Sequence, residues 1–197
     1  MMKPTLATAS LLLCAALAHA SDTVAPVDAL WKPQVINFVY RPNDAVYTCS
    51  GLWQKLAGML VHVGARPAAP SDRFKCDDVA GILTLEFALE SPAEATPENL
   101  RALTEHDSEA LLVARLQGRE AAAANEVRHF PAAWQTRSFR DRRLQLTVGD
   151  CELVQQLRQQ ILPKLAVEVV SEPPRCSALL VHGGRPAMTV RALVVTG

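Results

Sequence analysis

Cysteine is the residue type in this chain most able to do chemistry. The spacing of the cysteines indicates whether they exchange disulfides, bind zinc or form structural disulfides. Cys14 lies in an apolar N-terminal stretch, and four more cysteines follow at Cys49, Cys76, Cys151 and Cys176. No two of them form a Cys-x-x-Cys motif, so thiol–disulfide exchange is not indicated. None stands at zinc-ligand spacing from a histidine. The pattern therefore favours structural disulfides.

The histidines beyond residue 20 are the other candidates for chemistry. His62 falls near the end of a predicted helix, where a cation suits the helix dipole. His106 precedes Asp107, which could orient it as a base, whereas His182 opens a Gly-Gly-Arg-Pro turn. No nucleophile elbow, phosphate-binding loop, dinucleotide fingerprint or zincin helix is present in the sequence. We therefore assign no catalytic, metal-binding or cofactor-binding residue, and keep a hydrolase using His106 or His129 as the alternative.

The N-terminus has the three parts of a secretory signal peptide. Lys3 supplies the positive start, residues 6–17 are apolar and uncharged, and Ala18-His19-Ala20 gives the small-x-small pattern that signal peptidase recognises. An apolar run of about 12 residues is shorter than the about 20 that span a bilayer. We expect residues 1–20 to be removed between Ala20 and Ser21. The mature protein would be periplasmic or secreted, without a stable membrane anchor.

The charge balance excludes some classes of partner. Removal of residues 1–20 leaves 19 basic against 20 acidic residues, a net charge of −1. A near-neutral domain has no electrostatic attraction to nucleic acid or to an anionic membrane. The arginines between residues 137 and 143 form a basic run, but no aromatic row or helix accompanies it, so a solvated strand or loop is the better interpretation.

Two amphipathic helices are predicted, each beginning at a cysteine. The first starts near Cys49 and the second near Cys151, and a shift of 101 residues aligns their apolar stripes. The aligned pairs are Leu52 with Leu153, Trp53 with Val154, Leu56 with Leu157, and Leu60 with Ile161. We expect Thr48 or Ser50 to cap the first helix and Asp150 to cap the second.

Strands are predicted on both sides of each helix. They cover residues 35–40, 45–48 and 82–89 in the first half, and 134–139, 144–148, 167–170 and 188–195 in the second, with a weaker candidate near 71–75. Gly64 is expected to end the first helix, and Pro163 to end or kink the second. The predicted fold is α+β, an antiparallel sheet with helices packed on one face. It is built from a duplicated, disulfide-stapled β-β-α-β-β unit.

The predicted organisation is one domain after a short tail. Its parts are a flexible tail at 21–30, a domain at 31–197, repeat halves at about 31–91 and 132–197, and a connecting segment at 92–131. Pro97 marks a helix start in the connecting segment. Residues 111–116 are either a strand or the tail of that helix.

The repeat selects among the three pairings that four cysteines allow. Cys49 and Cys76 are 27 residues apart, and Cys151 and Cys176 are 25 apart. Each first cysteine stands at the front of a helical pattern, and each second one precedes an apolar run. If each half is a copy, each carries its own bond. We predict Cys49–Cys76 and Cys151–Cys176, with a crossed pairing as the less direct alternative.

The tryptophans are expected to be structural. Trp53 lies on the apolar stripe of the first helix, which places it in the core. Trp31 is expected to staple the N-terminus to the fold, and Trp134 opens a strand. An exposed ligand platform is the less favoured alternative for each.

Several short runs resemble a known but uncharacterised family. These are Trp31-Lys32-Pro33-Gln34 with Phe38, Tyr47-x-Cys49, Phe130-Pro131-Ala132-x-Trp134, and Gly149-Asp150-Cys151-Glu152-Leu153. They resemble small exported proteins of Gram-negative bacteria over most of residues 31–176. The resemblance implies export and the extent of the domain, and it implies no activity. The favoured function is a non-catalytic periplasmic or secreted binding module with an envelope or extracellular partner, and the alternative is a secreted hydrolase.

Overall fold

The computed structural model describes residues 25–43, 45–68, 74–104, 116, 127–172, 176 and 185–196. In this part of the chain seven strands form one antiparallel sheet, in the order β2-β4-β1-β5-β7-β6, and β3 also pairs with β4. Helices cover it, so the predicted antiparallel α+β fold is confirmed. Within the described residues, no helix combines the length and apolar character needed to cross a membrane.

The elements alternate along the chain. The strands are β1 (Val27–Tyr40), β2 (Arg66–Pro67), β3 (Lys75–Val79), β4 (Ile82–Glu94), β5 (His129–Ser138), β6 (Val167–Ser171) and β7 (Thr189–Val195). The helices are α1 (Cys49–His62), α3 (Pro97–Thr104) and α5 (Cys151–Gln160). The short 3-10 turns are η2 (Arg142–Leu144), η3 (Val148–Asp150) and η4 (Leu162–Lys164).

The two halves of the chain repeat one topology. The first half runs β1-α1-β3-β4 with the short β2 added, and the second runs β5-α5-β6-β7. In each half the last strand pairs with the first strand and with the strand before it. β1 and β5 then pair antiparallel, Val27 with Ala132 through Leu30 with His129, and so join the halves. The sheet therefore consists of two similar three-strand groups that are joined edge to edge by the pairing of β1 with β5.

The repeated unit has one strand fewer than predicted. Residues 45–48 and 144–148 form no strand, so β-β-α-β-β is wrong and the unit is β-α-β-β. Side chains bond the backbone in these segments instead of a neighbouring strand. The hydroxyl of Tyr40 donates to the carbonyl of Ala45 at 2.7 Å, and the N–H of Thr147 donates to Asp150 Oδ2 at 2.6 Å.

The first strand begins earlier than predicted. β1 starts at Val27, and Ala29 and Leu30 are fully buried, so this part of the predicted 21–30 tail is wrong. Its strand partners lie in β4 and β5, more than sixty residues away, so no local sequence pattern indicates them. The second half likewise begins at His129, inside the predicted connecting segment. Residues 1–24, and with them the predicted cleavage site, lie outside the described residues.

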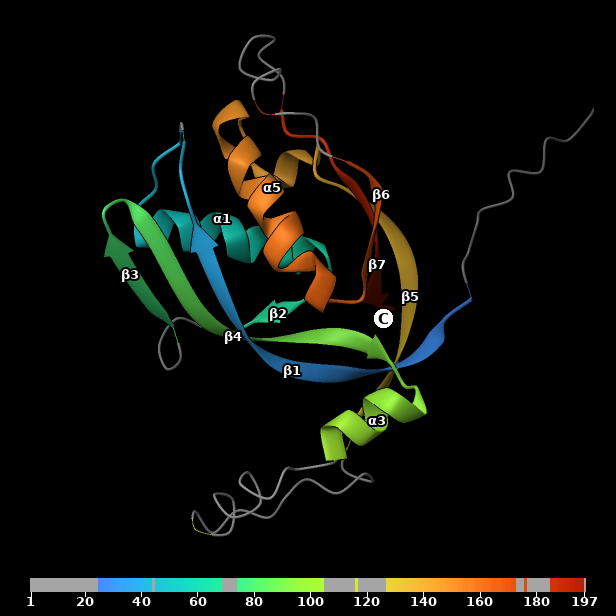
Figure 1. Ribbon diagram of the computed structural model, residues 1–197. Helices are drawn as coiled ribbons and strands as arrows, with labels where there is room; N and C mark the ends of the chain where they lie inside the picture. Colours follow the sequence, from blue (N-terminus) through green and yellow to red (C-terminus); the bar gives the residue numbers. More distant parts are fainter. Residues whose placement is uncertain are drawn as a thin grey trace, which may run out of the picture.

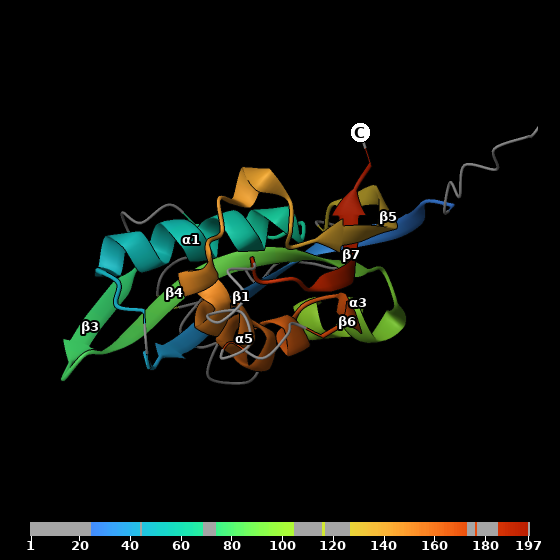
Figure 2. The same cartoon turned by 90° about the horizontal axis from the view of Figure 1, so that it is seen from above.

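Both long helices pack on the same face of the sheet. Figures 1 and 2 show the curved sheet wrapping around α1 and α5, with α3 on the opposite side. The predicted apolar stripes face the sheet and are fully buried at Leu52, Leu56, Leu60, Leu153, Leu157 and Ile161. Burying a leucine or isoleucine side chain contributes about 1.5–3 kcal/mol. Trp53 lies in this core as predicted, with its ring centroid 5.0 Å from that of Phe87.

The helix ends follow the sequence signals in part. Thr48 caps α1, accepting from the N–H of Gly51 at 3.1 Å. Gly64 follows α1 with φ +88°, in the left-handed region that glycine tolerates. A Cβ built at Gly64 would lie 2.8 Å from the carbonyl oxygen of Leu193 in β7. Gly64 thus ends α1, as predicted, and lets it approach the second half closely.

Both predicted disulfides are present. The Cα atoms of Cys49 and Cys76 are 6.1 Å apart, and those of Cys151 and Cys176 are 5.5 Å apart. The first bond ties the start of α1 to β3, and the second ties the start of α5 to Cys176. Each bond stays within one half of the chain.

The inner edge of β1 is occupied by a helix. From Trp31 onward β1 pairs only with β4 among the described strands, and α5 bonds the other edge near the end of the strand, from Val39 to Asn43. Glu152 Oε2 accepts from the N–H of Asn43 at 3.0 Å, and the Gln156 amide bonds both the N–H and the carbonyl of Arg41. Every fourth helical residue advances about 6 Å and every second strand residue about 6.7 Å, so the two periods match over this length.

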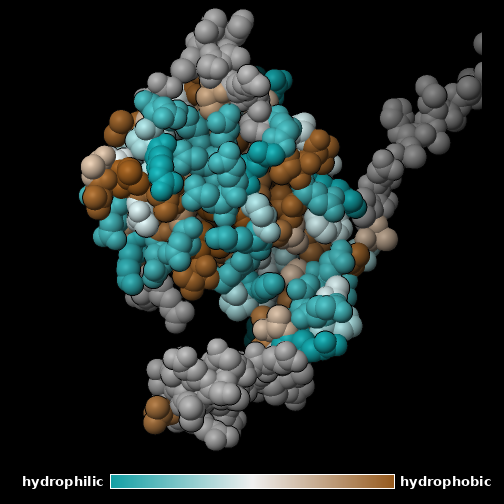
Figure 3. All heavy atoms as spheres, in the orientation of Figure 1, coloured by the Kyte–Doolittle hydropathy of each residue, from teal (hydrophilic) through white to brown (hydrophobic). Residues whose placement is uncertain are grey.

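The opposite side of α5 faces solvent. Gln155, Arg158 and Gln159 are half-buried or exposed there. Figure 3 shows that this side of the molecule is mainly hydrophilic, with smaller hydrophobic areas between. The helix therefore bonds the sheet edge on one side and presents polar groups to water on the other.

Candidate functional site

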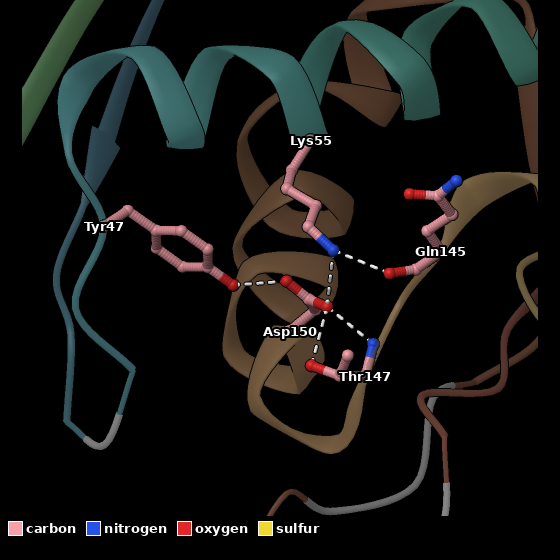
Figure 4. A network of polar contacts seen from close by, with 5 residues as sticks. All are labelled: Tyr47, Lys55, Gln145, Thr147 and Asp150. Atoms are coloured by element: carbon pink, nitrogen blue, oxygen red, sulfur yellow. Dashed lines mark hydrogen bonds and ion pairs between the residues drawn. The ribbon is translucent and has the colours of Figure 1, made fainter.

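The densest polar cluster of the described residues surrounds Asp150. Tyr47 donates to Asp150 Oδ1 at 2.5 Å, and Lys55 Nζ lies 3.1 Å from Oδ2 (Figure 4). The N–H and the hydroxyl of Thr147 also bond Oδ2, at 2.6 and 3.0 Å. Lys55 also donates to the carbonyl of Gln145 at 2.7 Å. The cluster therefore joins Tyr47 and Lys55 of the first half to the start of α5 in the second.

Burial and hydrogen bonding shift the pKa values of Asp150 and Tyr47, so that each has one protonation state near neutral pH. Burial raises the pKa of Asp150, but the hydrogen bonds from Tyr47, Thr147 and Lys55 together outweigh it, so the pKa lies below the usual value. Burial and then the bond to Asp150 raise the pKa of Tyr47. Asp150 is consequently a carboxylate and Tyr47 a neutral phenol at neutral pH.

This arrangement is suited to structure and not to catalysis. Asp150 is 2% exposed, and both of its oxygens accept hydrogen bonds from protein groups. A general base needs an oxygen that can reach a substrate proton. Asp150 was predicted to cap α5. It occupies that position, but its side chain bonds Thr147, Tyr47 and Lys55 and makes no capping bond to α5.

The two described histidines, His62 and His129, lie apart from one another. His62, at the end of α1, lies with Nε2 3.1 Å from the carbonyl oxygen of Ser138. Burial, followed by the nearby Arg137, lowers its pKa. His62 therefore favours the neutral form, contrary to the expectation of a cation there. His106, Asp107 and His182 lie outside the described residues.

His129, of the described histidines, lines a surface pocket. Its Nδ1 lies 2.7 Å from Asp28 Oδ2, across the junction between β1 and β5. The ring is accessible to solvent and lines a groove of about 700 Å³. A smaller hollow of about 330 Å³ shares His129 and Phe130 with the groove. Sequence reasoning named His129 without giving it a partner.

The groove lies on the face of the sheet opposite α1 and α5. In β1 the core residues Ile36, Phe38 and Tyr40 alternate with outward positions that include Trp31 and Pro33. Glu90 lies opposite Pro33 on β4, and Arg66 lies opposite Glu90 on β2. Leu103 of α3 and Val195 of β7 close two sides. Strand register thus assembles the groove from both halves of the chain.

Aromatic rings form the centre of this groove. The ring centroids of Trp31 and Phe130 are 4.8 Å apart, and the guanidinium carbon of Arg66 lies 3.8 Å from the Trp31 centroid. Both rings are only half-buried. Trp31 does fix the N-terminal strand through Phe130, as predicted, and it also offers accessible surface.

A second tryptophan lies on the same outer face. Trp134 Nε1 donates to Glu94 at 2.7 Å, and the Arg191 guanidinium lies 5.2 Å from its ring centroid. Beside it Ala29, Ala132 and Leu193 form a small buried cluster, against which Phe130 also packs. This cluster holds the rim of the groove to the sheet.

The charges of the groove are incompletely paired. Arg66, Arg128 and Glu90 line it and are exposed. In the described part of the chain, none of the three takes part in an ion pair. Among the described residues there is also no group of three His, Cys, Asp or Glu side chains that could hold a metal ion.

Sequence reasoning missed most of this groove. Arg66, Glu90 and Arg128 stand in no motif, and they line one groove only because strands distant in sequence pair with one another. The available signal was local: a tryptophan two residues before a proline, at Trp31 and Pro33, and Phe130-Pro131 near the start of β5.

Comparison with family models, with curated proteins and with solved structures finds no match to this chain.

Proposed function

We propose that this chain is exported and that its mature domain is a non-catalytic binding module, whose ligand lies in the groove at the junction of the two halves. The observation that most directly supports binding is the open groove, in which the rings of Trp31 and Phe130 remain accessible to solvent. Its volume of about 700 Å³ falls among those typical of small-molecule sites, about 300–1,000 Å³. The ligand would be an envelope or extracellular molecule.

Two features support export. The Met1–Ala20 segment has the pattern of a signal peptide. The two disulfides are of the kind that persist in oxidising compartments. Expression of the full chain with its own N-terminus, followed by intact-mass measurement of periplasmic and culture fractions, should give protein that begins at Ser21. Retention of Met1 on membrane-bound material would contradict export.

Binding in the groove is tested with an apolar fluorescent dye, phenylnaphthylamine, and its sulfonated relative, anilinonaphthalene sulfonate. At least one should bind the oxidised protein saturably. Phe130→Ala should weaken that binding about fivefold, because it removes a stacking surface. Val46→Ala, at an 83% exposed position outside the groove, is the control. Absence of saturable binding by both dyes, or equal binding by the Phe130 variant, would refute the groove as a binding site.

A secreted hydrolase is the second candidate, favoured by the His129–Asp28 pair at 2.7 Å beside the groove. Asp28 could orient the imidazole as a base. None of the described residues that line the groove carries a hydroxyl or a thiol, so an attacking side chain is not at hand. Hydrolysis of nitrophenyl esters that is abolished by His129→Gln would favour this candidate. Turnover unchanged by that substitution would favour the binding module.

A further inference from the structure

Arg66 is the best-positioned anion-binding group of the groove. Its guanidinium carbon lies 3.8 Å from the Trp31 ring centroid, and the described residues offer it no carboxylate within ion-pair distance. Stacking on an aromatic ring orients the planar guanidinium and leaves its N–H groups available at the edges. Those edges match the two oxygens of a carboxylate, sulfonate or phosphate.

The remaining charges of the groove favour an anion. Arg128 adds a second positive charge and Glu90 a single negative one. Asp28 lines the smaller hollow beside the groove and is already bonded by His129. The lining therefore has an excess of arginine over free carboxylate. Arg66 lies on β2, and Arg128 immediately precedes β5, which is three strands away in the sheet order. Three strand spacings are about 14 Å at the backbone, so one small anionic group that contacts Arg66 interacts with Arg128 only at longer range.

The centre of the groove suits an apolar body. Trp31 and Phe130 lie side by side there, with Leu103 and Val195 beside them. Such surfaces gain free energy by covering rings or acyl chains. A strongly hydrated ion without an apolar part would leave this surface unused.

From these contacts we infer that the groove takes a small amphipathic anion, with its carboxylate, sulfonate or phosphate on Arg66 and its planar or acyl body on Trp31 and Phe130. The inference rests on the proposed binding function and names the ligand class of the same groove.

The experiment compares two dyes that share one ring system. Anilinonaphthalene sulfonate carries a sulfonate and phenylnaphthylamine does not, so the ratio of their dissociation constants isolates the anionic group. The full chain should bind the sulfonate about tenfold more tightly, and Arg66→Gln should remove that preference, as expected for a charge-assisted hydrogen bond. Arg128→Gln should weaken sulfonate binding only about twofold to threefold, through long-range attraction.

The Glu90→Gln substitution should change the affinity for the sulfonated dye in the direction opposite to the arginine substitutions. Removal of this carboxylate should tighten sulfonate binding about twofold and leave binding of the neutral dye unchanged. Arg140→Gln, at an exposed arginine outside the groove, is the matched control and should change neither constant. Thermal unfolding of each variant shows that it is folded.

Two further ligands distinguish the sources of the anion. Displacement of the sulfonated dye by laurate indicates an acyl ligand, and displacement by benzoate indicates an aromatic one; either supports the inference. Equal binding of both dyes with no effect of Arg66→Gln would overturn the anionic ligand while leaving groove binding intact. No saturable binding of either dye would instead overturn the proposed function itself.

Discussion

The side-chain amide of Gln160 makes with Val39 both hydrogen bonds that a neighbouring strand would make. The N–H of Val39 donates to Gln160 Oε1 at 2.9 Å, and Gln160 Nε2 donates to the Val39 carbonyl at 2.9 Å. Val39 belongs to the first half and Gln160 to the second, 121 residues later. A helix thus completes the edge of β1 by side chains alone. A sheet edge covered in this way cannot pair with another chain.

Gln160→Ala should destabilise the protein by about 1–3 kcal/mol, because it leaves the N–H and the carbonyl of Val39 without partners in a partly buried place. Gln159→Ala, at an exposed position of the same helix, should change stability by less than about 0.5 kcal/mol. Denaturant titration of the oxidised protein measures both. Equal stabilities of the two variants would show that the edge bonds contribute nothing.

Asp150→Asn should cost about 3 kcal/mol at neutral pH, since it removes the charge that Lys55 and Tyr47 bind in a buried place. The pKa of Asp150 is lower in the fold than in the unfolded chain, where it is about 3.9. The carboxylate therefore contributes its stability above that value and loses it as the pH falls through the lower folded pKa.

The difference in unfolding free energy between wild type and Asp150→Asn should accordingly be constant from about pH 6 to 8 and narrow below about pH 4. Asp77→Asn, at an exposed position of β3, is the control and should follow wild type. A difference that widens in acid would mean that the folded state raises the Asp150 pKa.

His62 should make the fold sensitive to mild acid. Burial lowers its pKa from the ordinary value of about 6.5, so the unfolded chain binds a proton more readily than the fold does. Stability then falls as the pH drops from about 7.5 through that value. The His62→Gln variant should have a flatter stability profile between about pH 5 and 7.5 when measured by denaturant titration. If the stability of the His62→Gln variant depends on pH as steeply as that of the wild type, another titrating group causes the pH dependence.

Leu157→Ala should cost about 2–5 kcal/mol, because this fully buried side chain faces the sheet and its removal leaves a cavity. Leu56→Ala should cost a similar amount for the same reason. Val170→Ala, 63% exposed on β6, should change stability by less than about 0.5 kcal/mol. Denaturation midpoints in urea measure all three. A near-neutral Leu157→Ala would place this side chain outside the core.

Replacement of both Cys49 and Cys76 by serine should lower stability by about 3.5 kcal/mol, as expected for a closed loop with a sequence separation of 27. Peptide mapping without reduction should recover one linked pair from this half and one that joins Cys151 to Cys176. A linked peptide that contains Cys49 and Cys151 would contradict the structure.

Sequence patterns correctly predicted the features that depend on residues close together in the chain, such as the two long helices. The stripes at Leu56 and Leu157 repeat at helical spacing, and their helices lie where that spacing placed them. The strand expected at 144–148 does not form, because Asp150 bonds the backbone of Thr147 across three residues. The groove was not predictable in this way, since Arg66 meets Trp31 only after β4 has paired with both β1 and β2.

Neither disulfide crosses from one half to the other, and this has a consequence for a cleaved form of the protein. A single cut between α3 and β5 would leave two fragments, each closed by its own bond. The four residue pairs between β1 and β5, the Asp150 cluster and the Gln160 bonds would then be an interface between separate molecules. Association would depend on concentration, so the two fragments could serve as a complementation pair whose reassembly restores the groove.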